Sequence, residues 1–409
     1  MNRFFITPDI QTALGALSVD KNLGVVCVDQ GNVVDKLQKE GYKIFSYEKE
    51  TGRTILRNSK LLLMQPETKK YINSFKGLKQ FVFFKPPLLP QKLLADYQFP
   101  TILNNDAHLS SQIENKLYLK NFNVKTPKEI TNPVEFPVVL QYENGYAGNS
   151  TFVVHNDKDL QTLISSRKGD YKIVEYIKNN GTYTNNCFCY NDKVLISELF
   201  FQYTGIPQLT RTKLGSCGNN YFVNIDENIK KQIKLYSKNI GEHLLSVKYR
   251  GFFGIDFVLS KDGEVFVVEV NPRFTASISF FTQLEKLSDT ETFFEKQIKV
   301  FSGDNKQIET RYNSILRGKR LLVRNDTFED KIVKGDYKSG IYKIENGQFV
   351  FLRENFFVED LNGQEVLLFI KNKGFVAKPE TDIINFYTLS NIPEETIVNA
   401  LINLKNQIM

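Results

Sequence analysis

Residues 251–273 read GFFGIDFVLSKDGEVFVVEVNPR, and this stretch decides the fold. Apolar and β-branched runs flank a Lys-Asp-Gly turn, a combination that predicts two antiparallel strands joined as a hairpin. Side chains at i and i+2 share one face of a strand, so Glu269, Asn271 and Arg273 project from the same side. Asp256, on the preceding strand, comes alongside them across the turn. The hairpin therefore gathers two carboxylates, an amide and a guanidinium on one sheet surface.

These side chains are the donors expected of a magnesium site. Carboxylate and amide oxygens are hard ligands that hold Mg²⁺ against substrate phosphates, and Mn²⁺ accepts the same set. A forked guanidinium beside them suits a phosphate or a developing oxyanion. The alternative is a solvent-facing hairpin on which Glu269 and Arg273 form a surface pair. Pro272 counts against it, because proline near a strand end marks a shaped exit. We therefore predict a metal site at Asp256, Glu269 and Asn271.

A glycine-containing loop lies between two apolar runs further upstream. Gly145 and Gly148 would let backbone N–H groups approach phosphate oxygens, with Asn149 and Ser150 as further donors. Ordinary hairpin loops use the same residue types, so the loop alone does not distinguish a phosphate site from a turn.

A second segment, Glu175-Tyr176-Ile177, leaves an apolar strand and enters Asn-Asn-Gly-Thr. A backbone hinge there would read an adenine edge, with Glu175 accepting the adenine amino group. This signal is also weak when it is taken alone.

The first hundred residues alternate short apolar runs with polar helical stretches, which predicts βαβ units and a parallel sheet. The expected strands are 3–7, 23–29, 42–47, 81–85 and 100–104. The last hundred residues are rich in β-branched and aromatic residues, contain two Asn-Gly turns and end in a helical stretch. They predict a small β-rich domain.

Composition narrows the class of protein. The chain has 409 residues, 41% of them hydrophobic, and a formal net charge of +7. That length predicts two to three domains. No cluster of Lys and Arg marks a nucleic-acid surface, and no apolar run approaches the ~18 residues of a membrane span. Four cysteines do not make a disulfide framework. The mild positive charge is compatible with small anionic ligands but does not point to them. We expect a soluble, cytoplasmic protein that binds neither nucleic acid nor a membrane.

The hairpin, the loop and the hinge segment occur in an order that resembles the ATP-grasp superfamily over roughly residues 100–305. The hairpin pattern D…E-x-N-x-R is the specific part of this resemblance. The stretch ENKLYLKNFNVKTP resembles the lysine-bearing helix of the family, which implies that Lys116 contacts the nucleotide. The stretch FPVVLQYENGYAGNSTFVV resembles the strand and flexible loop that close over the triphosphate, and VEYI resembles the hinge between the two lobes.

One position departs from the family pattern. The first strand of the domain usually ends in a lysine that binds phosphate, and Gln141 stands there. An amide still donates a hydrogen bond, but it loses a charge-assisted contact worth roughly 1.5–3 kcal/mol. Arg211 and Lys213 fall where the family often supplies cations to the γ-phosphate or acyl phosphate. The departure therefore implies either weaker nucleotide binding or compensation by these two residues.

The resemblance implies a mixed α/β and α+β architecture with the ATP-grasp fold. A Rossmann-like pre-ATP-grasp domain would span 1–105, a two-lobed ATP-grasp domain 106–308 with its hinge near 175–182, and a β-rich domain 309–409.

The activity implied by this resemblance is that of an ATP-dependent carboxylate–amine ligase. Such an enzyme uses ATP with Mg²⁺ or Mn²⁺ and forms an amide or peptide bond through an acyl phosphate. Arg273 would steady the acyl phosphate and the later oxyanion. Two alternatives stay open: carboxylation through carboxyphosphate, and a nucleotide-binding regulatory module that no longer turns over. The partners expected are a small carboxylate and an amine. The oligomeric state is open, with a homodimer the commonest closed assembly.

Overall fold

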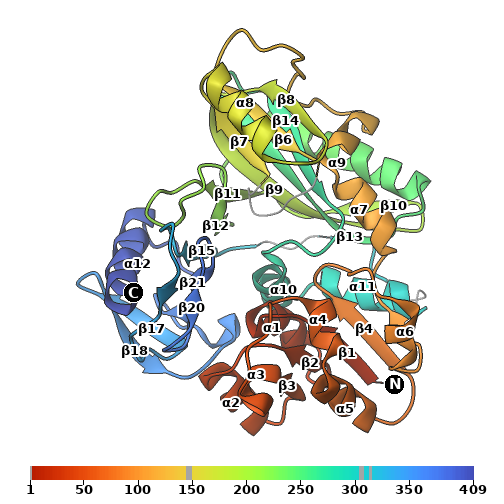
Figure 1. Ribbon diagram of the computed structural model, residues 1–409, viewed down its shortest axis with the longest axis vertical. Coiled ribbons are helices and arrows are strands. Elements are labelled where there is room, and N and C mark those ends of the chain that lie inside the picture. Colours follow the sequence, from red (N-terminus) through yellow and green to blue (C-terminus); the bar gives the residue numbers. More distant parts are fainter. Residues whose placement is uncertain (1, 144–149, 304–307, 313–315) are drawn as a thin grey trace.

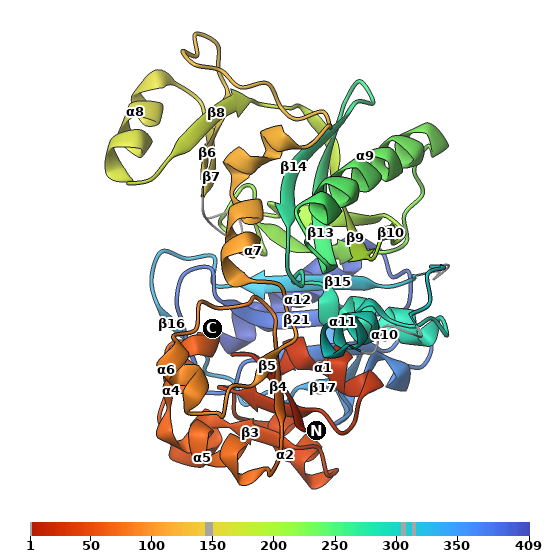
Figure 2. The same cartoon turned by 90° about the vertical axis from the view of Figure 1, so that its right-hand side faces the viewer.

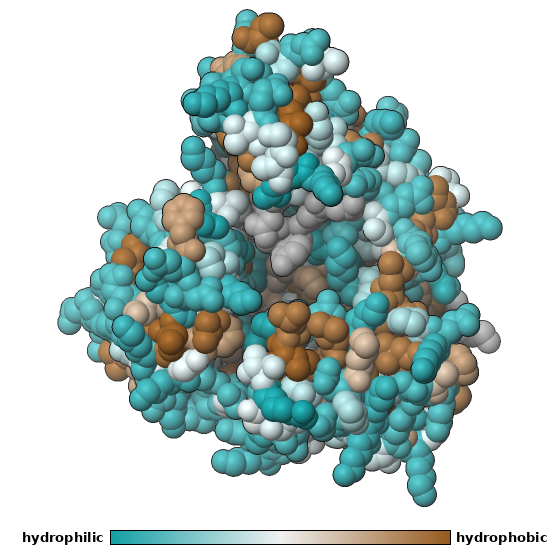
Figure 3. All heavy atoms as spheres, in the orientation of Figure 1, coloured by the Kyte–Doolittle hydropathy of each residue, from teal (hydrophilic) through white to brown (hydrophobic). Residues whose placement is uncertain are grey.

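The computed structural model describes residues 2–143, 150–303, 308–312 and 316–409. Figure 1 shows the N-terminal part in red and orange, the C-terminal part in blue, and the middle of the chain in yellow and green above them. In the same orientation, the surface is hollowed where these three parts meet (Figure 3).

The N-terminal part is a parallel sheet with strand order β3-β2-β1-β4-β5, which confirms the α/β prediction. Strands β2, β3 and β4 are buried throughout, as expected for a parallel sheet with helices on both faces. The strands are β1 (Asn2–Ile6), β2 (Gly24–Cys27), β3 (Ile44–Ser46), β4 (Lys79–Phe83) and β5 (Thr101–Ile102). The helices are α1 (Ile10–Val19), α2 (Asn32–Lys39), α3 (Tyr47–Thr51), α4 (Ser59–Met64), α5 (Pro66–Ser74) and α6 (Gln91–Ala95).

A short helical connection leads from this part to the middle of the chain. It consists of α7 (Ala107–Glu114) and the 3₁₀ helix η1 (Lys116–Asn121). The Asp106 side chain caps the start of α7 by accepting from two backbone N–H groups. Both helices pack against strand β14, and Figure 2 shows α7 running beside it.

A small lobe follows, built from a three-stranded antiparallel sheet in the order β7-β6-β8. Its elements are β6 (Val138–Tyr142), β7 (Thr151–Val154), α8 (Asp157–Ser166) and β8 (Tyr171–Glu175). Leu140 and Tyr142 pack with Leu160 of α8, so the helix covers one face of the sheet. Strand alternation turns Gln141 to the opposite face. Figure 2 shows this lobe standing apart from α9 and β13.

The larger lobe is an antiparallel sheet that continues into the C-terminal part. Strand order runs β14-β13-β9-β11-β12-β15-β21-β19-β17-β18, with β10 paired to β9. The strands from the middle of the chain are β9 (Asn179–Tyr190), β10 (Lys193–Ile196), β11 (Phe200–Thr204), β12 (Ser216–Asn220), β13 (Gly251–Ser260) and β14 (Val265–Asn271). The helix α9 (Glu227–Ser246) packs on β9, β10 and β14. The sheet thus crosses the domain boundary expected near residue 308.

The C-terminal part is β-rich and ends in a helix. Its strands are β15 (Lys319–Arg324), β16 (Lys331–Ile332), β17 (Gly340–Glu345), β18 (Gln348–Arg353), β19 (Val366–Ile370), β20 (Val376–Ala377) and β21 (Asp382–Thr388), with the 3₁₀ helix η3 at Val358–Asp360. The closing helix is α12 (Glu394–Ile408), and its buried face joins the core of this part. Within the described ranges, no helix is both long and apolar enough to cross a bilayer.

Two helices tie the middle of the chain to the N-terminal sheet. They are α10 (Ile278–Leu287) and α11 (Phe293–Ser302). Helix α1 crosses α10 at Gly15, whose N–H donates to Ser279 Oγ at 3.0 Å. A Cβ added at Gly15 would lie 2.4 Å from the Ser279 carbonyl oxygen, so only glycine allows this approach.

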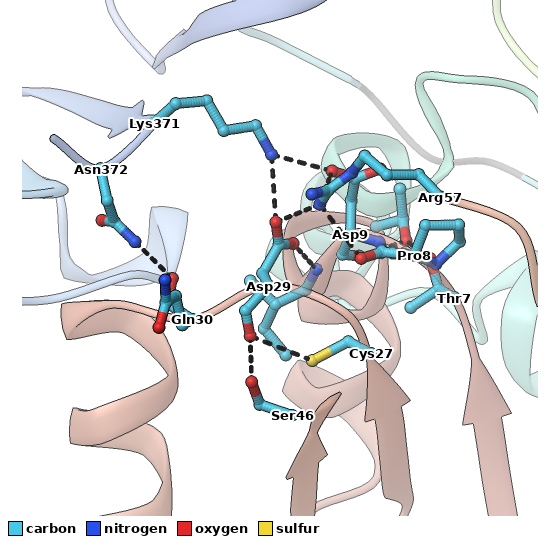
Figure 4. Close-up of polar contacts among 12 residues, drawn as sticks. Thr7, Pro8, Asp9, Cys27, Asp29, Gln30, Ser46, Arg57, Lys371 and Asn372 are labelled. Atoms are coloured by element: carbon cyan, nitrogen blue, oxygen red, sulfur yellow. Dashed lines mark hydrogen bonds and ion pairs between the residues drawn. The ribbon is translucent and has the colours of Figure 1, made fainter. Parts of the chain in front are cut away.

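Charged side chains join the C-terminal part to the N-terminal sheet (Figure 4). Asp9 and Asp29 follow β1 and β2, and both contact Arg57 Nη2. Lys371, just after β19, places its Nζ 2.9 Å from Asp9 Oδ1 and 3.1 Å from Asp29 Oδ1. Burial alone would raise the pKa of Asp9, but Lys371 and Arg57 hold it well below its usual value. We call these four residues the interdomain charge cluster.

Candidate nucleotide and metal site

Asp256 and Glu269 are direct cross-strand partners on the hairpin formed by β13 and β14. Near the turn Phe257 pairs with Val267, so an uninterrupted ladder would place Asp256 opposite Val268. An irregularity between Asp256 and Phe257 shifts the register by one residue and brings the carboxylates face to face. Bulges of this kind re-aim side chains beside functional sites.

Two side chains hold Asp256 in place. The Thr184 hydroxyl on β9 donates to Asp256 Oδ1 at 2.6 Å, and Asn271 Nδ2 donates to Oδ2 at 3.1 Å. Burial raises the pKa of Asp256, and the neighbouring charge of Glu269 raises it further, to about 7. Hydrogen bonds from Thr184 and Asn271 and the charge of Arg273 oppose this rise in the pKa without cancelling it.

These residues fit a divalent cation. The two carboxylates supply oxygen ligands, which Mg²⁺ and Mn²⁺ prefer. Asn271 turns its amide nitrogen to Asp256 and its oxygen to Arg273, so its predicted role as an oxygen ligand would require the amide to turn over. Two facing carboxylates repel each other, and a cation bound between them would relieve that repulsion. The described residues contain no cluster of three or more His, Cys, Asp or Glu side chains that could hold a metal ion, so this candidate site rests on a pair of carboxylates.

Metal affinity is expected to depend on pH near neutrality, because Asp256 must lose its proton to act as a ligand. Lowering the pH from about 8 to about 6 should weaken Mn²⁺ binding roughly tenfold. The same raised pKa means that metal-free stability is full below the usual aspartate pKa and is lost as the pH rises through about 7. Mn²⁺ titrations by electron paramagnetic resonance across this range check the expectation. A flat profile, or an unchanged profile in Asp256→Asn, would contradict it.

Arg273 belongs to a second layer of contacts behind the carboxylates. Its Nη2 donates to Asn271 Oδ1 at 3.0 Å, and its Nε donates to Glu114 Oε1 at 2.8 Å. Lys85 Nζ lies 2.5 Å from the other oxygen of Glu114. Burial would raise the pKa of Glu114, but Arg273 and Lys85 hold it below its usual value. Arg273 is thus fixed in direction rather than free to swing.

Lys116 opens η1, two residues after Glu114, and is only 5% exposed. Its Nζ donates to Ser150 Oγ at 2.6 Å and to Thr151 Oγ1 at 3.0 Å. The hairpin residue Asn271 is therefore linked to Lys116 through Arg273, Glu114 and the start of η1. Gly145, Gly148 and Asn149 lie outside the described residues.

Gln141 lies on β6 with Thr151 of β7 and Lys172 of β8 as its cross-strand partners. Cross-strand partners project from the same face, so the three side chains form one row on the face away from α8. We call it the cross-strand row.

The hinge segment meets the expectation only in part. Glu175 ends β8, and its Oε1 accepts the backbone N–H of Lys128 at 2.8 Å. Strand alternation also places Glu175 on the opposite face from Lys172. The Glu175 carboxylate therefore binds the Lys128 backbone and lies on the opposite face from the cross-strand row. Contact of adenine with the Tyr176 and Ile177 backbones stays a prediction.

Arg211 is placed toward the C-terminal part. The Arg211 backbone N–H donates to Glu380 Oε1 at 2.8 Å, and its guanidinium carbon lies 4.4 Å from the centre of the Phe328 ring. Lys213 is exposed. The structure does not bring either residue into contact with Asp256 or Glu269, because Glu380 and Phe328 hold the loop elsewhere.

Sequence reasoning missed Thr184, Glu114 and Lys172. Glu114 had a local signal, since it opens the stretch ENKLYLKNFNVKTP. Thr184 and Lys172 had none, because only the pairing of β9 with β13 and of β8 with β6 reveals their neighbours.

Comparisons with known proteins agree with this geometry. Residues 110–277 match the family described as "ATP-grasp domain". No curated protein matches the sequence. Among solved structures, N5-carboxyaminoimidazole ribonucleotide synthetase from Thermotoga maritima shares 14% identity, with a TM-score of 0.54 and coverage of 99% of this chain and 98% of that one.

Two biotin carboxylases are also similar in fold. The biotin carboxylase domain of Hydrogenobacter thermophilus 2-oxoglutarate carboxylase, in complex with MgADP, ADP and bicarbonate, shares 13% identity, with a TM-score of 0.60 and coverage of 95% and 86%. Biotin carboxylase from Campylobacter jejuni shares 13% identity, with a TM-score of 0.60 and coverage of 97% and 89%. The family match over residues 110–277 and the fold shared with these structures together identify an ATP-grasp domain in the middle of this chain.

Proposed function

We propose that this protein is an ATP-dependent carboxylate–amine ligase that forms an amide or peptide bond through an acyl phosphate. The observation that carries the proposal is the facing pair of Asp256 and Glu269, continued by Asn271 into the fixed guanidinium of Arg273. That arrangement supplies the charges that phosphoryl transfer to a carboxylate needs, and it requires no histidine base.

The roles of the residues follow from their contacts. Asp256 and Glu269 orient carboxylate oxygens on one face of the hairpin, and the Asn271 amide links Asp256 to Arg273. These carboxylates would hold Mg²⁺, which would supply charge neutralisation to the substrate phosphates. Lys116, buried and fixed by two hydroxyl groups, presents an ammonium group to the same phosphates.

The covalent steps balance without another reactant. A carboxylate oxygen attacks the γ-phosphorus, the bond to the β-phosphate oxygen breaks, and ADP leaves. An amine then attacks the acyl carbon and expels phosphate, which carries away one oxygen of the original carboxylate. Arg273, held by Glu114, is placed to balance negative charge on the acyl phosphate and the tetrahedral oxyanion.

A second candidate is carboxylation through carboxyphosphate, in which bicarbonate takes the place of the carboxylate. The similar structures favour it, since they are carboxylating proteins by name and overlap this chain over 95–99% of its length. A nucleotide-binding regulatory module is the third candidate, and the neutral Gln141 favours it.

The test is a screen for ADP release with MgATP and pairs of carboxylates and amines, with bicarbonate and the amines as a parallel arm. Carboxylate labelled with oxygen-18 should deliver one label to the phosphate formed, and only when an amine is also present. Label transfer from bicarbonate, with none from the other carboxylates, would contradict the ligase proposal and support carboxylation. Nucleotide binding without any ADP release would contradict both enzymatic proposals and support the regulatory module.

A further inference from the structure

The cross-strand row consists of Gln141, Thr151 and Lys172, and Lys172 is its positively charged member. The positive charge therefore lies on β8, whereas Gln141, on β6, is neutral. Lys172 is directly opposite Gln141 on β8, and Cβ atoms of such partners lie about 5 Å apart. A lysine side chain reaches farther than that. The ammonium group of Lys172 can therefore reach a ligand that lies against the Gln141 side chain.

Lys172 is buried, with 9% of its surface exposed. Its Nζ donates to the backbone carbonyl oxygen of Lys116 at 2.9 Å, which places it beside the start of η1. Glu129 Oε1 lies farther away, at 3.9 Å, and the Glu129 side chain is 60% exposed. Burial lowers the pKa of Lys172; Glu129 opposes this, and the charge of Lys116 reinforces it.

Lys116 is the second buried ammonium group of this region, and it is bound by the hydroxyl groups of Ser150 and Thr151. Among the residues that the structure describes, no carboxylate lies within ion-pair distance of Lys116, and Lys172 has only the distant Glu129. Two buried cations that share so little negative charge are costly, because a buried charge needs a partner. An anionic ligand on this face would supply it.

We propose that Lys172 is a phosphate-binding residue that works with Lys116 and provides, from the neighbouring strand, the positive charge that Gln141 lacks. The ligand class is the oligophosphate of a nucleotide, so the inference rests on the proposed nucleotide site. It names a different residue for the missing charge than Arg211, which contacts Glu380 and Phe328 of the C-terminal part, or Lys213, which is exposed.

The test compares ADP and adenosine binding by calorimetry, in the presence of Mg²⁺, for the parent, Lys172→Met, Gln141→Lys and the double variant. Lys172→Met should weaken ADP binding by about 10–100-fold and leave adenosine binding unchanged, because one charge-assisted contact is lost. The double variant should regain most of the ADP affinity, since its lysine stands on the same row. Lys158→Met, exposed on α8, is the matched control and should bind as the parent does.

The outcomes separate this inference from the proposed function. A parent that binds no ADP would overturn the nucleotide site and the inference together. A parent that binds ADP, with Lys172→Met binding it equally well, would overturn the inference alone. Equal losses of ADP and adenosine in Lys172→Met, without rescue in the double variant, would assign Lys172 a structural role instead.

Discussion

Glu269→Gln is expected to remove metal binding while leaving the fold intact. The glutamine keeps the shape of the side chain but removes one of the two facing carboxylates. Loss of a supporting partner alone costs about 10–100-fold in metal affinity, so loss of a ligand should weaken Mn²⁺ binding at least about 100-fold. ADP formation should fall by about 10²–10³-fold or more. Electron paramagnetic resonance titration of Mn²⁺ with ADP present, and ADP release, measure both effects.

Glu264→Gln is the matched control for this variant. Glu264 lies at the turn of the same hairpin, is exposed, and pairs with Lys125 Nζ at 2.5 Å. The substitution removes one negative charge from the same hairpin, as Glu269→Gln does, but at a position away from the candidate metal site. It should leave Mn²⁺ binding unchanged. Equal losses in the two variants would mean that hairpin stability, not metal ligation, accounts for the effect.

Lys371→Met is expected to give the largest loss of stability. Lys371 is 9% exposed and contacts both Asp9 and Asp29, so its removal leaves the buried Asp29 and the partly exposed Asp9 with Arg57 alone. Breaking a buried ion-pair network by removing one partner costs about 3–5 kcal/mol. Thermal unfolding followed by circular dichroism should show the loss as a lower transition temperature.

Two further variants identify the cause. Lys371→Met with Asp9→Asn restores the charge balance of the interdomain charge cluster and should recover part of the lost stability. Lys373→Met, an exposed neighbour, should unfold as the parent does. If the double variant is less stable than Lys371→Met, packing of the lysine stem rather than charge balance is the cause.

The interdomain charge cluster is also expected to make the free energy of unfolding depend on pH in acid. The lowered pKa of Asp9 contributes stability above the usual aspartate value, and that contribution is lost as the pH falls through its folded value. In Lys371→Met one of the two cations that lower this pKa is absent. The acid-sensitive part of the stability should therefore become smaller in that variant.

Much of the fold was accessible from sequence because its signals are local. Alternation of apolar runs and helical stretches indicated the parallel sheet that β1 to β5 form. A two-residue period placed Glu269 and Asn271 on one face, and the Lys-Asp-Gly turn indicated that Asp256 would come near. Even there, the register shift beside Asp256 had no sequence signal, although it decides which residue faces Glu269.

The remaining features depend on contacts between distant parts of the chain. Lys172 meets Gln141 only because β8 pairs with β6, and Glu114 meets Arg273 only because α7 packs on β14. The residues RTK indicated cations for the phosphates, but Glu380 from the C-terminal part holds Arg211 elsewhere. No pattern within a short window records these partners.

The central claim is that the hairpin carboxylates hold a divalent cation against nucleotide phosphates. The most direct measurement is calorimetric titration of ADP with and without Mg²⁺, for the parent and Glu269→Gln. The account predicts that Mg²⁺ strengthens ADP binding at least about tenfold in the parent and not in Glu269→Gln. ADP binding that is independent of Mg²⁺ in the parent, or equally dependent on it in both proteins, would contradict the account.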